Sequence, residues 1–323
     1  MIMEEFEIKN FEKAPYLELE NYKAPAGINS NYVEMDDGIK IRVCYWLNKE
    51  KNNSGTIILQ QGHNEFIEKY FETIDEFLKK GFAIIAFDWR GQGMSGRMIK
   101  EIEKSYIKDF ERHDKDFDEI LKLIETKKFP MPYIGIGHSM GGCLMLSAFY
   151  RHPKKLRVGI LSAPMLGFKN EGFLKAASSL MNLTKKDTDY LIGSKPNMGI
   201  ETPFKENDLT RDSERYERTL KLIRKNPSIR LWGVTNSFAK AVNQRFKIIR
   251  KKGWVEEIDT KVLVINSLED RVVDPVKTVK TVKRLKNYEI IDFKDCEHEI
   301  FMERDIHRNR MWKKIEEFLS NNV

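Results

Sequence analysis

The sequence is poor in cysteine and contains no long hydrophobic run. Its three cysteines, Cys44, Cys143 and Cys296, lie far apart among 323 residues and match neither a metal-binding spacing nor a disulfide framework. We therefore expect reduced thiols near a core, no bound metal, and a cytoplasmic protein. No stretch approaches the roughly 18 consecutive apolar residues of a membrane-spanning helix. The acidic first ten residues do not resemble a signal peptide.

An excess of charge of one sign is also lacking. The 56 basic and 49 acidic residues leave a net charge of +7, which is modest for this length and does not indicate nucleic-acid binding. Hydrophobic residues make up 41% of the chain and charged residues 33%, which favours a globular protein with a substantial core and a hydrated surface. The length suits one large domain that carries an insert.

Short apolar segments alternate with helical patterns, which predicts a mostly parallel sheet with helices on both faces. A hairpin is expected over 31–47, with its turn at Asp37-Gly38. Between 164 and 259 there is no clear buried strand, only helix-like segments rich in Lys and Arg. We predict a discontinuous core, 1–163 and 260–323, and a helical cap insert, 164–259. Six apolar runs read as buried strands: 56–60, 82–87, 132–136, 158–161, 261–266 and 288–293. Helical patterns in the core cover 70–80, 107–126, 276–285 and 304–319.

The segment Gly137-His138-Ser139-Met140-Gly141 lies between a predicted buried strand and a predicted buried helix. This context is typical of a nucleophilic serine on a strained turn, with its hydroxyl exposed and facing the positive end of the following helix. A glycine-rich turn without chemistry is the alternative for the five residues alone. The choice depends on whether an acid and a base follow in the chain.

A serine needs a histidine to take its proton and a carboxylate to orient that histidine. Asp270 lies in a loop just beyond the strand 261–266, and we assign it as the acid ahead of Glu269 and Asp274. Asp274 precedes a proline, which favours a helix N-cap instead. His298 follows the last strand in a loop, whereas His307 falls in a helical pattern, so His298 is the predicted base.

Two backbone N–H groups are needed to stabilise the oxyanion. One is expected from Met140, directly after the serine. The other is expected from His63, in the loop after the strand 56–60, where Gly62 permits close approach of the backbone.

Together these motifs resemble the α/β-hydrolase family of lysophospholipases and monoacylglycerol lipases, the serine aminopeptidase S33-like hydrolases. The resemblance implies hydrolysis of a carboxylic ester in a lipid with one acyl chain, without metal or cofactor. Many relatives carry histidine where this chain has Gln61, and we interpret Asp88 and Arg90 as residues that order loops. The matching segments are 62–65, 87–95, 137–142, 270–273 and 297–299. The segment of the insert from 208–212 to 232–233 is similar to the bacterial lysophospholipase L2 type.

The insert contains ten basic residues and no acidic one between Lys221 and Lys252. Two interpretations stay open: a solvated face whose apolar side chains pack on the core, or contact with an anionic membrane at its inner face. The acyl-chain slot is expected in the insert, and oligomeric state is not predictable from these features. Alternative functions are a small-molecule carboxylesterase, an aminopeptidase, or a ligand-binding protein without catalysis. The candidate slot residues are Phe168, Phe173, Leu180 and Met181.

Overall fold

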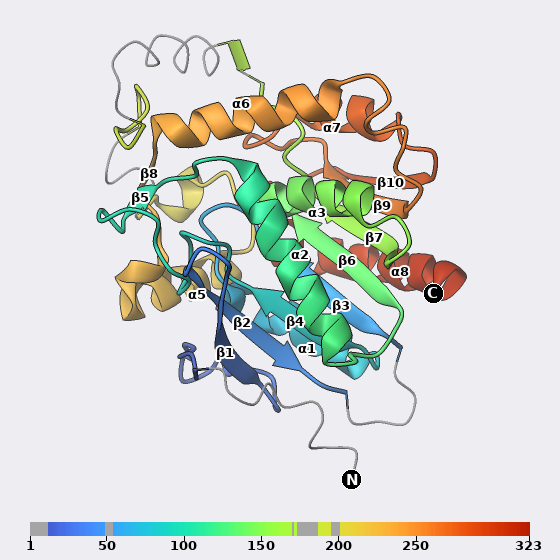
Figure 1. The fold of residues 1–323 in the computed structure, drawn as a ribbon, viewed down its shortest axis with the longest axis horizontal. Coiled ribbons are helices and arrows are strands. Elements are labelled where there is room, and N and C mark those ends of the chain that lie inside the picture. The colour runs from blue at the N-terminus through green and yellow to red at the C-terminus, as the bar shows by residue number, and fades with distance from the viewer. Residues whose placement is uncertain (1–11, 49–53, 170, 173–186, 195–200) are drawn as a thin grey trace.

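A central sheet of eight strands runs through the molecule (Figure 1). In this computed structural model the strand order is β1-β2-β4-β3-β6-β7-β9-β10, with antiparallel pairs only at the β1-β2-β4 edge. The structure describes residues 12–48, 54–169, 171–172, 187–194 and 201–323. The strands are β1 Asn29–Glu34, β2 Lys40–Trp46, β3 Thr56–Gln60, β4 Ala83–Phe87, β6 Tyr133–His138, β7 Leu156–Ser162, β9 Lys261–Ser267 and β10 Tyr288–Phe293.

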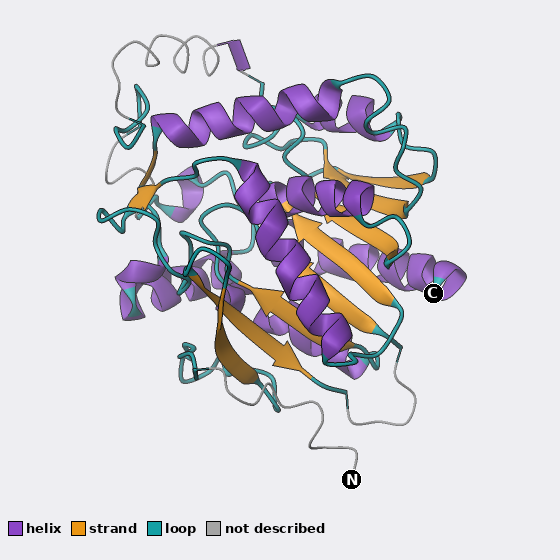
Figure 2. Ribbon diagram, viewed as in Figure 1, coloured by secondary structure: helices purple, strands orange, loops and turns teal. Residues whose placement is uncertain are grey.

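Helices cover both faces of this sheet (Figure 2). Side chains alternate between faces along a strand, so in β4 Ile85 and Phe87 join one apolar cluster, and Ile84 and Ala86 join the other. Helices α2 and α3 pack in the first cluster, and α1 and α8 in the second. Burial on both sides explains why the strands read as continuous apolar runs. The helices are α1 Phe71–Lys79, α2 Phe110–Thr126, α3 Ser139–Arg151, α5 Ser213–Lys225, α6 Asn236–Arg250, α7 Pro275–Val282 and α8 Asp305–Asn322.

The ends of the helices follow local capping residues. Helix α2 begins at Phe110, three residues later than the expected 107. Asp109 is its N-cap, because the Asp109 side chain accepts a hydrogen bond from the Arg112 amide. Asp274 caps α7 and Pro275 occupies its first position, as predicted. The predicted helix 70–80 corresponds to α1, which follows a 3₁₀ turn, Ile67–Tyr70. Helix α8 extends three residues beyond the predicted end at 319.

The segment between β7 and β9 adds no strand to the central sheet in its described part. Its described strand, β8 (Gly233–Val234), pairs with β5 (Lys104–Ser105) outside the sheet. Helix α5 packs through Leu222 against Phe66, whereas α6 packs through Val242 and Phe246 into the cluster of α2 and α3. The two helices lie apart, with α6 along the top of Figure 1 and α5 at the left, well below it.

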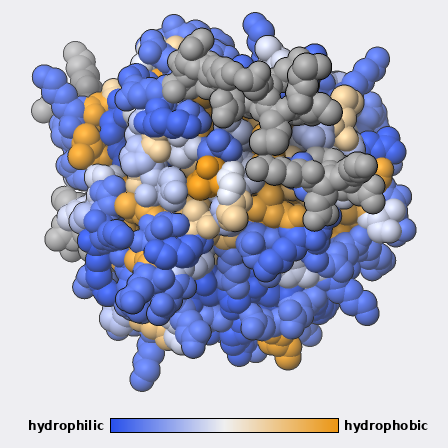
Figure 3. All heavy atoms as spheres, turned by 90° about the horizontal axis from the view of Figure 1, so that it is seen from below, coloured by the Kyte–Doolittle hydropathy of each residue, from blue (hydrophilic) through white to orange (hydrophobic). Residues whose placement is uncertain are grey.

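The surface is largely hydrophilic, as the composition predicts. Seen from the side opposite to α6, hydrophobic residues gather mainly in a band across an otherwise polar face (Figure 3). Within the described part of the chain, no helix combines the length and the hydropathy required to cross a bilayer. In this α/β architecture, loops follow the carboxyl ends of the parallel strands. Ligands bind at that edge in such sheets.

Candidate active site

Ser139 lies on a sharp turn between β6 and α3. Its φ angle is +50°, in the left-handed region that costs a non-glycine residue about 1–3 kcal/mol. A Cβ at Gly137 would lie 2.6 Å from the Gly141 carbonyl oxygen, and one at Gly141 would lie 2.5 Å from the carbonyl oxygens of Gln60 and Gln61. Backbone segments thus crowd against the turn, which explains both glycines of the motif.

Asp270 and His298 form a buried hydrogen-bonded pair. The distance between Asp270 Oδ2 and His298 Nδ1 is 2.6 Å, and the two residues are 1% and 3% exposed. The other oxygen of Asp270 accepts the amides of Val272 and Val273 at 2.8 and 2.9 Å. Because β9 and β10 are parallel neighbours, the loops that follow them meet at one edge of the sheet. This is the geometry that the predicted acid and base require.

The imidazole of His298 lies beside the serine turn. Its ring centroid is 4.7 Å from that of His138, the residue before Ser139. The structure, which describes both residues, shows no direct hydrogen bond between Ser139 and His298. Such bonds are often long without substrate and tighten in the reacting complex. The structure thus joins the predicted acid to the predicted base and places the base beside the serine turn.

Electrostatics favour a basic His298. Burial alone would lower the pKa of His298, but Asp270, by its charge and its hydrogen bond, raises the pKa above the ordinary value. Burial would raise the pKa of Asp270, yet His298 and the two backbone amides hold it below its ordinary value. The neighbouring His138 stays neutral, because burial lowers its pKa to about 3.

The two residues predicted to supply the oxyanion amides, His63 and Met140, belong to segments next to Ser139. A Cβ at Gly62 would lie 3.1 Å from the Ser139 Cβ, so the loop after β3 touches the serine. Met140 is the second residue of α3, and its N–H therefore has no carbonyl partner within the helix. Among the described residues, neither the Met140 N–H nor the His63 N–H is bonded to an acceptor.

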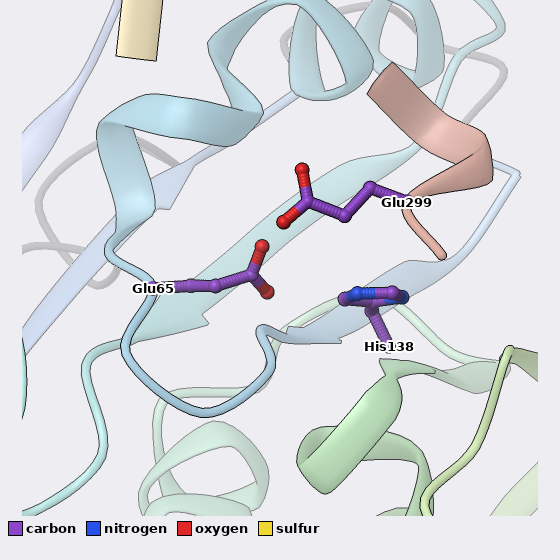
Figure 4. Close-up of side chains that lie close together, drawn as sticks. All are labelled: Glu65, His138 and Glu299. Atoms are coloured by element: carbon purple, nitrogen blue, oxygen red, sulfur yellow. The ribbon is translucent and has the colours of Figure 1, made fainter. Parts of the chain in front are cut away.

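A buried ionic cluster beside this loop was not predicted. Figure 4 shows its two carboxylates, Glu65 and Glu299, with His138 beside them. Lys69 Nζ lies 2.6 Å from Glu65 Oε1 and 2.5 Å from Glu299 Oε1. The second oxygen of Glu65 accepts the Gly62 N–H and the Tyr70 hydroxyl. The cluster therefore holds the oxyanion loop against the histidine loop. The available signals were the Glu65–Lys69 spacing of four residues and the position of Glu299 directly after His298.

The same cluster contains a set of groups with metal-ligand chemistry. Ligand atoms of Glu65, His138 and Glu299 lie within 4.8 Å of one another. However, the Lys69 ammonium already supplies a positive charge to both carboxylates. Burial would raise the pKa of Glu65, but Lys69 and His138 lower it to about 2. A cation would have to displace a buried ammonium group, so we interpret the cluster as structural.

Asp88 and Arg90 make the structural contacts expected of them. Asp88 Oδ1 accepts the Gln61 side-chain amide at 2.9 Å, and its Oδ2 accepts Arg42 Nε at 2.8 Å. Arg90 binds Asp116 and lies 2.8 Å from Asp37 Oδ2. Gln61, where many relatives have histidine, thus fastens the start of the oxyanion loop to Asp88.

A cavity of about 460 Å³ opens beside the oxyanion loop. Its lining includes His63 and Ser105, together with Tyr216, Leu220 and Trp232 of the segment between β7 and β9. The predicted slot residues do not fall in this cavity as far as they can be placed. Phe168 packs against Phe246 with ring centroids 5.5 Å apart, and Phe173, Leu180 and Met181 lie outside the described residues.

A serine on a strand–turn–helix elbow, with an acid and a histidine on later loops of a mostly parallel sheet, defines the α/β-hydrolase class of proteins. The model of the family "Serine aminopeptidase, S33" matches residues 51–305. The chain belongs to this family, and the resemblance inferred from its motifs is confirmed.

Individual relatives are distant in sequence. A probable lysophospholipase L2 of Haemophilus influenzae is 24% identical over 296 residues, covering 90% of this chain and 92% of the relative. A soluble variant of monoglyceride lipase from Saccharomyces cerevisiae, solved with a substrate analog, superposes with a TM-score of 0.73 at 19% identity, covering 94% and 100% of the two chains. A carboxyl esterase from Bacillus coagulans gives 0.74 at 20% identity, with 92% and 99% covered. These structures confirm the α/β-hydrolase fold.

Proposed function

We propose that the protein is a serine esterase that hydrolyses the carboxylic ester of a lipid with one acyl chain, a lysophospholipid or a monoacylglycerol. The observation that carries this proposal is the buried Asp270–His298 hydrogen bond beside the Ser139 turn. The family assignment supports hydrolytic chemistry. The name of the relative from Haemophilus influenzae, which matches over nearly the whole chain, supports a lysophospholipid substrate.

In the proposed reaction, the Ser139 hydroxyl attacks the ester carbonyl while His298 Nε2 takes its proton. Asp270 keeps the other proton of the ring on Nδ1 and stabilises the imidazolium. The oxyanion of the tetrahedral intermediate accepts the N–H groups of His63 and Met140. Collapse expels the alcohol, which receives the proton from His298. Water then attacks the acyl-enzyme with His298 again as base, and the fatty acid leaves.

Residues 164–259 serve in this proposal as a cap over the site, and we call them the cap segment. Their described part supplies one wall of the cavity beside the oxyanion loop, through Tyr216, Leu220 and Trp232. Apolar and polar groups are mixed there, which suits an amphipathic substrate. Phe168, Phe173, Leu180 and Met181 stay candidates for contact with the acyl chain.

Covalent labelling with a fluorophosphonate tests the catalytic assignment. Wild type should be labelled at Ser139 and Ser139→Ala should not, with ester hydrolysis reduced by about 10⁴-fold or more. Full activity of Ser139→Ala, or no labelling of wild type, would contradict the proposal; the second result would favour a ligand-binding protein. A panel of lysophospholipid, monoacylglycerol, p-nitrophenyl ester and aminoacyl-arylamide separates lipid esterase from carboxylesterase and aminopeptidase.

Contact with an anionic membrane is proposed for the C-terminal end of α6. Lys247, Lys251 and Lys252 are exposed there, and Ile248 between them is 46% exposed. Arg245 of the same basic segment is instead buried and lies 2.6 Å from Asp114. The apolar residues interleaved with the basic ones are mostly buried: Leu222, Ile229, Leu231, Phe238, Val242 and Phe246.

Sedimentation with vesicles that contain phosphatidylserine tests this contact. Each basic residue near such a surface contributes about 1 kcal/mol, so changing the three lysines at the end of α6 to Gln should weaken binding about 100-fold. The matched control changes three exposed lysines of other regions, Lys122, Lys154 and Lys313, to Gln. Equal loss in both variants, or none in the first, would contradict a specific contact.

A further inference from the structure

The side chain of His63 is held by groups that come from outside the central sheet. Its Nε2 is hydrogen bonded to the hydroxyl of Ser105, which lies in β5 and is 1% exposed. Its ring centroid is 4.5 Å from that of Phe238, in the first turns of α6. The residue whose amide is assigned to the oxyanion hole is therefore fixed through its imidazole as well.

Ser105 is in turn fastened to the cap segment. Its carbonyl oxygen accepts both the backbone N–H and the hydroxyl of Thr235, at 3.1 and 2.8 Å. Thr235 is the N-cap of α6, and the hydroxyl oxygen of Thr235 accepts the Phe238 N–H at 3.3 Å. The pairing of β5 with β8 extends the same attachment. Ser105, Thr235 and Phe238 thus form one connected unit with His63.

The next residue of the loop is tied to the same part of the chain. Asn64 has a φ angle of +60°, a conformation that asparagine tolerates better than most residues. Its Oδ1 accepts the Leu231 N–H at 2.6 Å, and its own N–H donates to Gln92 Oε1 at 2.5 Å. Two consecutive loop residues therefore depend on contacts with residues 231–238.

The His63 contact does not require a charged imidazole. Burial lowers the pKa of His63 to about 4, so the ring is neutral throughout the range in which His298 can act as a base. A variant that only breaks this contact should thus leave the pH dependence set by His298 unchanged. His63 and Ser105 also line the cavity beside the oxyanion loop.

From this geometry we propose that the imidazole of His63 is a positioning group. By binding Ser105 it aligns the backbone amide of His63 in the oxyanion hole. It thereby couples the docking of the cap segment to the geometry of the oxyanion hole. The inference rests on the proposed esterase function. The backbone amide of His63 acts on the substrate, whereas its side chain acts through Ser105 and Phe238. Loss of the side chain should therefore slow the chemical step without abolishing it.

A pair of conservative variants tests this role. Gln places its amide near the position of His Nε2 and can still reach Ser105, whereas Asn is too short. With a short, soluble p-nitrophenyl ester, His63→Asn should lower kcat about 10–100-fold, less than the roughly 10²–10³-fold loss of a whole oxyanion donor. KM should change less than about threefold. His63→Gln should recover most of the lost kcat, and Ser105→Ala should lower kcat as much as His63→Asn.

The double variant and an inhibitor distinguish positioning from general damage. If the two groups act through one contact, Ser105→Ala combined with His63→Asn should lose no more than either single variant. An alkyl boronic acid, which forms a tetrahedral anion on the serine, should bind more weakly in proportion to the fall in kcat. Fluorescence melting checks that the variants are folded, and Ser105→Ala carries the test if His63→Asn does not fold.

Several results would overturn the inference. The first is a kcat of His63→Asn within about twofold of wild type. The second is a loss of kcat in the double variant equal to the product of the two single losses. The third is an unchanged affinity for the boronic acid despite a lower kcat. An altered pH profile would also count against it. Wild type that neither hydrolyses esters nor reacts with fluorophosphonate would refute the proposed function itself, and the positioning role with it. An active wild type with unaffected variants would refute the positioning role alone.

Discussion

Replacement of Asp270 by Asn offers a severe test, because the structure fixes how the new side chain must lie. Oδ1 of Asp270 accepts the N–H groups of Val272 and Val273. The oxygen of the introduced amide would have to take this place, since its NH₂ group there would face two donors. The NH₂ group would then face His298 Nδ1, at the position where the carboxylate now lies 2.6 Å away.

A donor at this position reverses the tautomer of His298. The neutral ring would accept at Nδ1 and carry its proton on Nε2, which then cannot take the proton of Ser139. Turning the amide over would restore the tautomer but leave the N–H groups of Val272 and Val273 without their acceptor, at about 1–3 kcal/mol for the buried one. We therefore expect kcat to fall about 10⁴-fold, as for the equivalent change in other triads. This equals about 5.5 kcal/mol of transition-state stabilisation.

The assay is steady-state hydrolysis of a p-nitrophenyl ester across about pH 5–9. Asp274→Asn is the matched control, because Asp274 caps α7 and asparagine is an equally good N-cap. Its kcat should stay within about twofold of wild type. A loss smaller than about tenfold in Asp270→Asn, or a larger loss in the control, would refute the assignment of the acid and the reasoning about the tautomer.

Burial and charge support three more predictions. The base, His298, must be neutral to act, and the charge of Asp270 raises the pKa of His298 above 6.5. The kcat/KM of wild type should therefore fall as the pH drops through a value above 6.5. A half-maximal rate below about pH 6 would contradict this. Gly141→Ala should destabilise the fold by about 1–3 kcal/mol and lower the Tm, because the added Cβ would clash with backbone oxygens. Gly172→Ala is the control and should leave the Tm unchanged, because a Cβ there would have no atom within 4 Å. The thiols should react with Ellman's reagent only after denaturation, and rapid reaction of the native protein would show that they are accessible. Burial raises the pKa of all three to about 12: Cys44, Cys143 and Cys296.

The expected strands and the proposed triad could be read from the sequence because each depends on short-range patterns and on chain order. The run 288–293 coincides with β10, and the Gly-x-Ser-x-Gly context identified the turn at Ser139. Asp270 and His298 could be paired because loops that follow neighbouring parallel strands meet at one edge. No structural detail was needed for these assignments beyond the order of the elements.

The surroundings of the site could not be read in this way. Lys69 and Glu299 are 230 residues apart in the chain, and a buried ion pair at that separation leaves no periodic signal. The bond between His63 and Ser105 depends on how β5, β8 and α6 dock, as does the cavity beside it. The basic segment 221–252 was ambiguous because its pattern does not show which apolar side chains find a core to pack against.

Local sterics and hydrophobic periodicity act between near neighbours in the chain. The order of strands and helices, the strained serine turn, and the acid and base expected to serve it could therefore be inferred from the amino-acid sequence alone. The contacts that hold the oxyanion loop were decided by the tertiary structure. Buried polar groups need hydrogen-bond partners, and tertiary packing determines which partners lie within reach. The ionic cluster of Lys69 and the bond of the His63 imidazole are both consequences of that requirement.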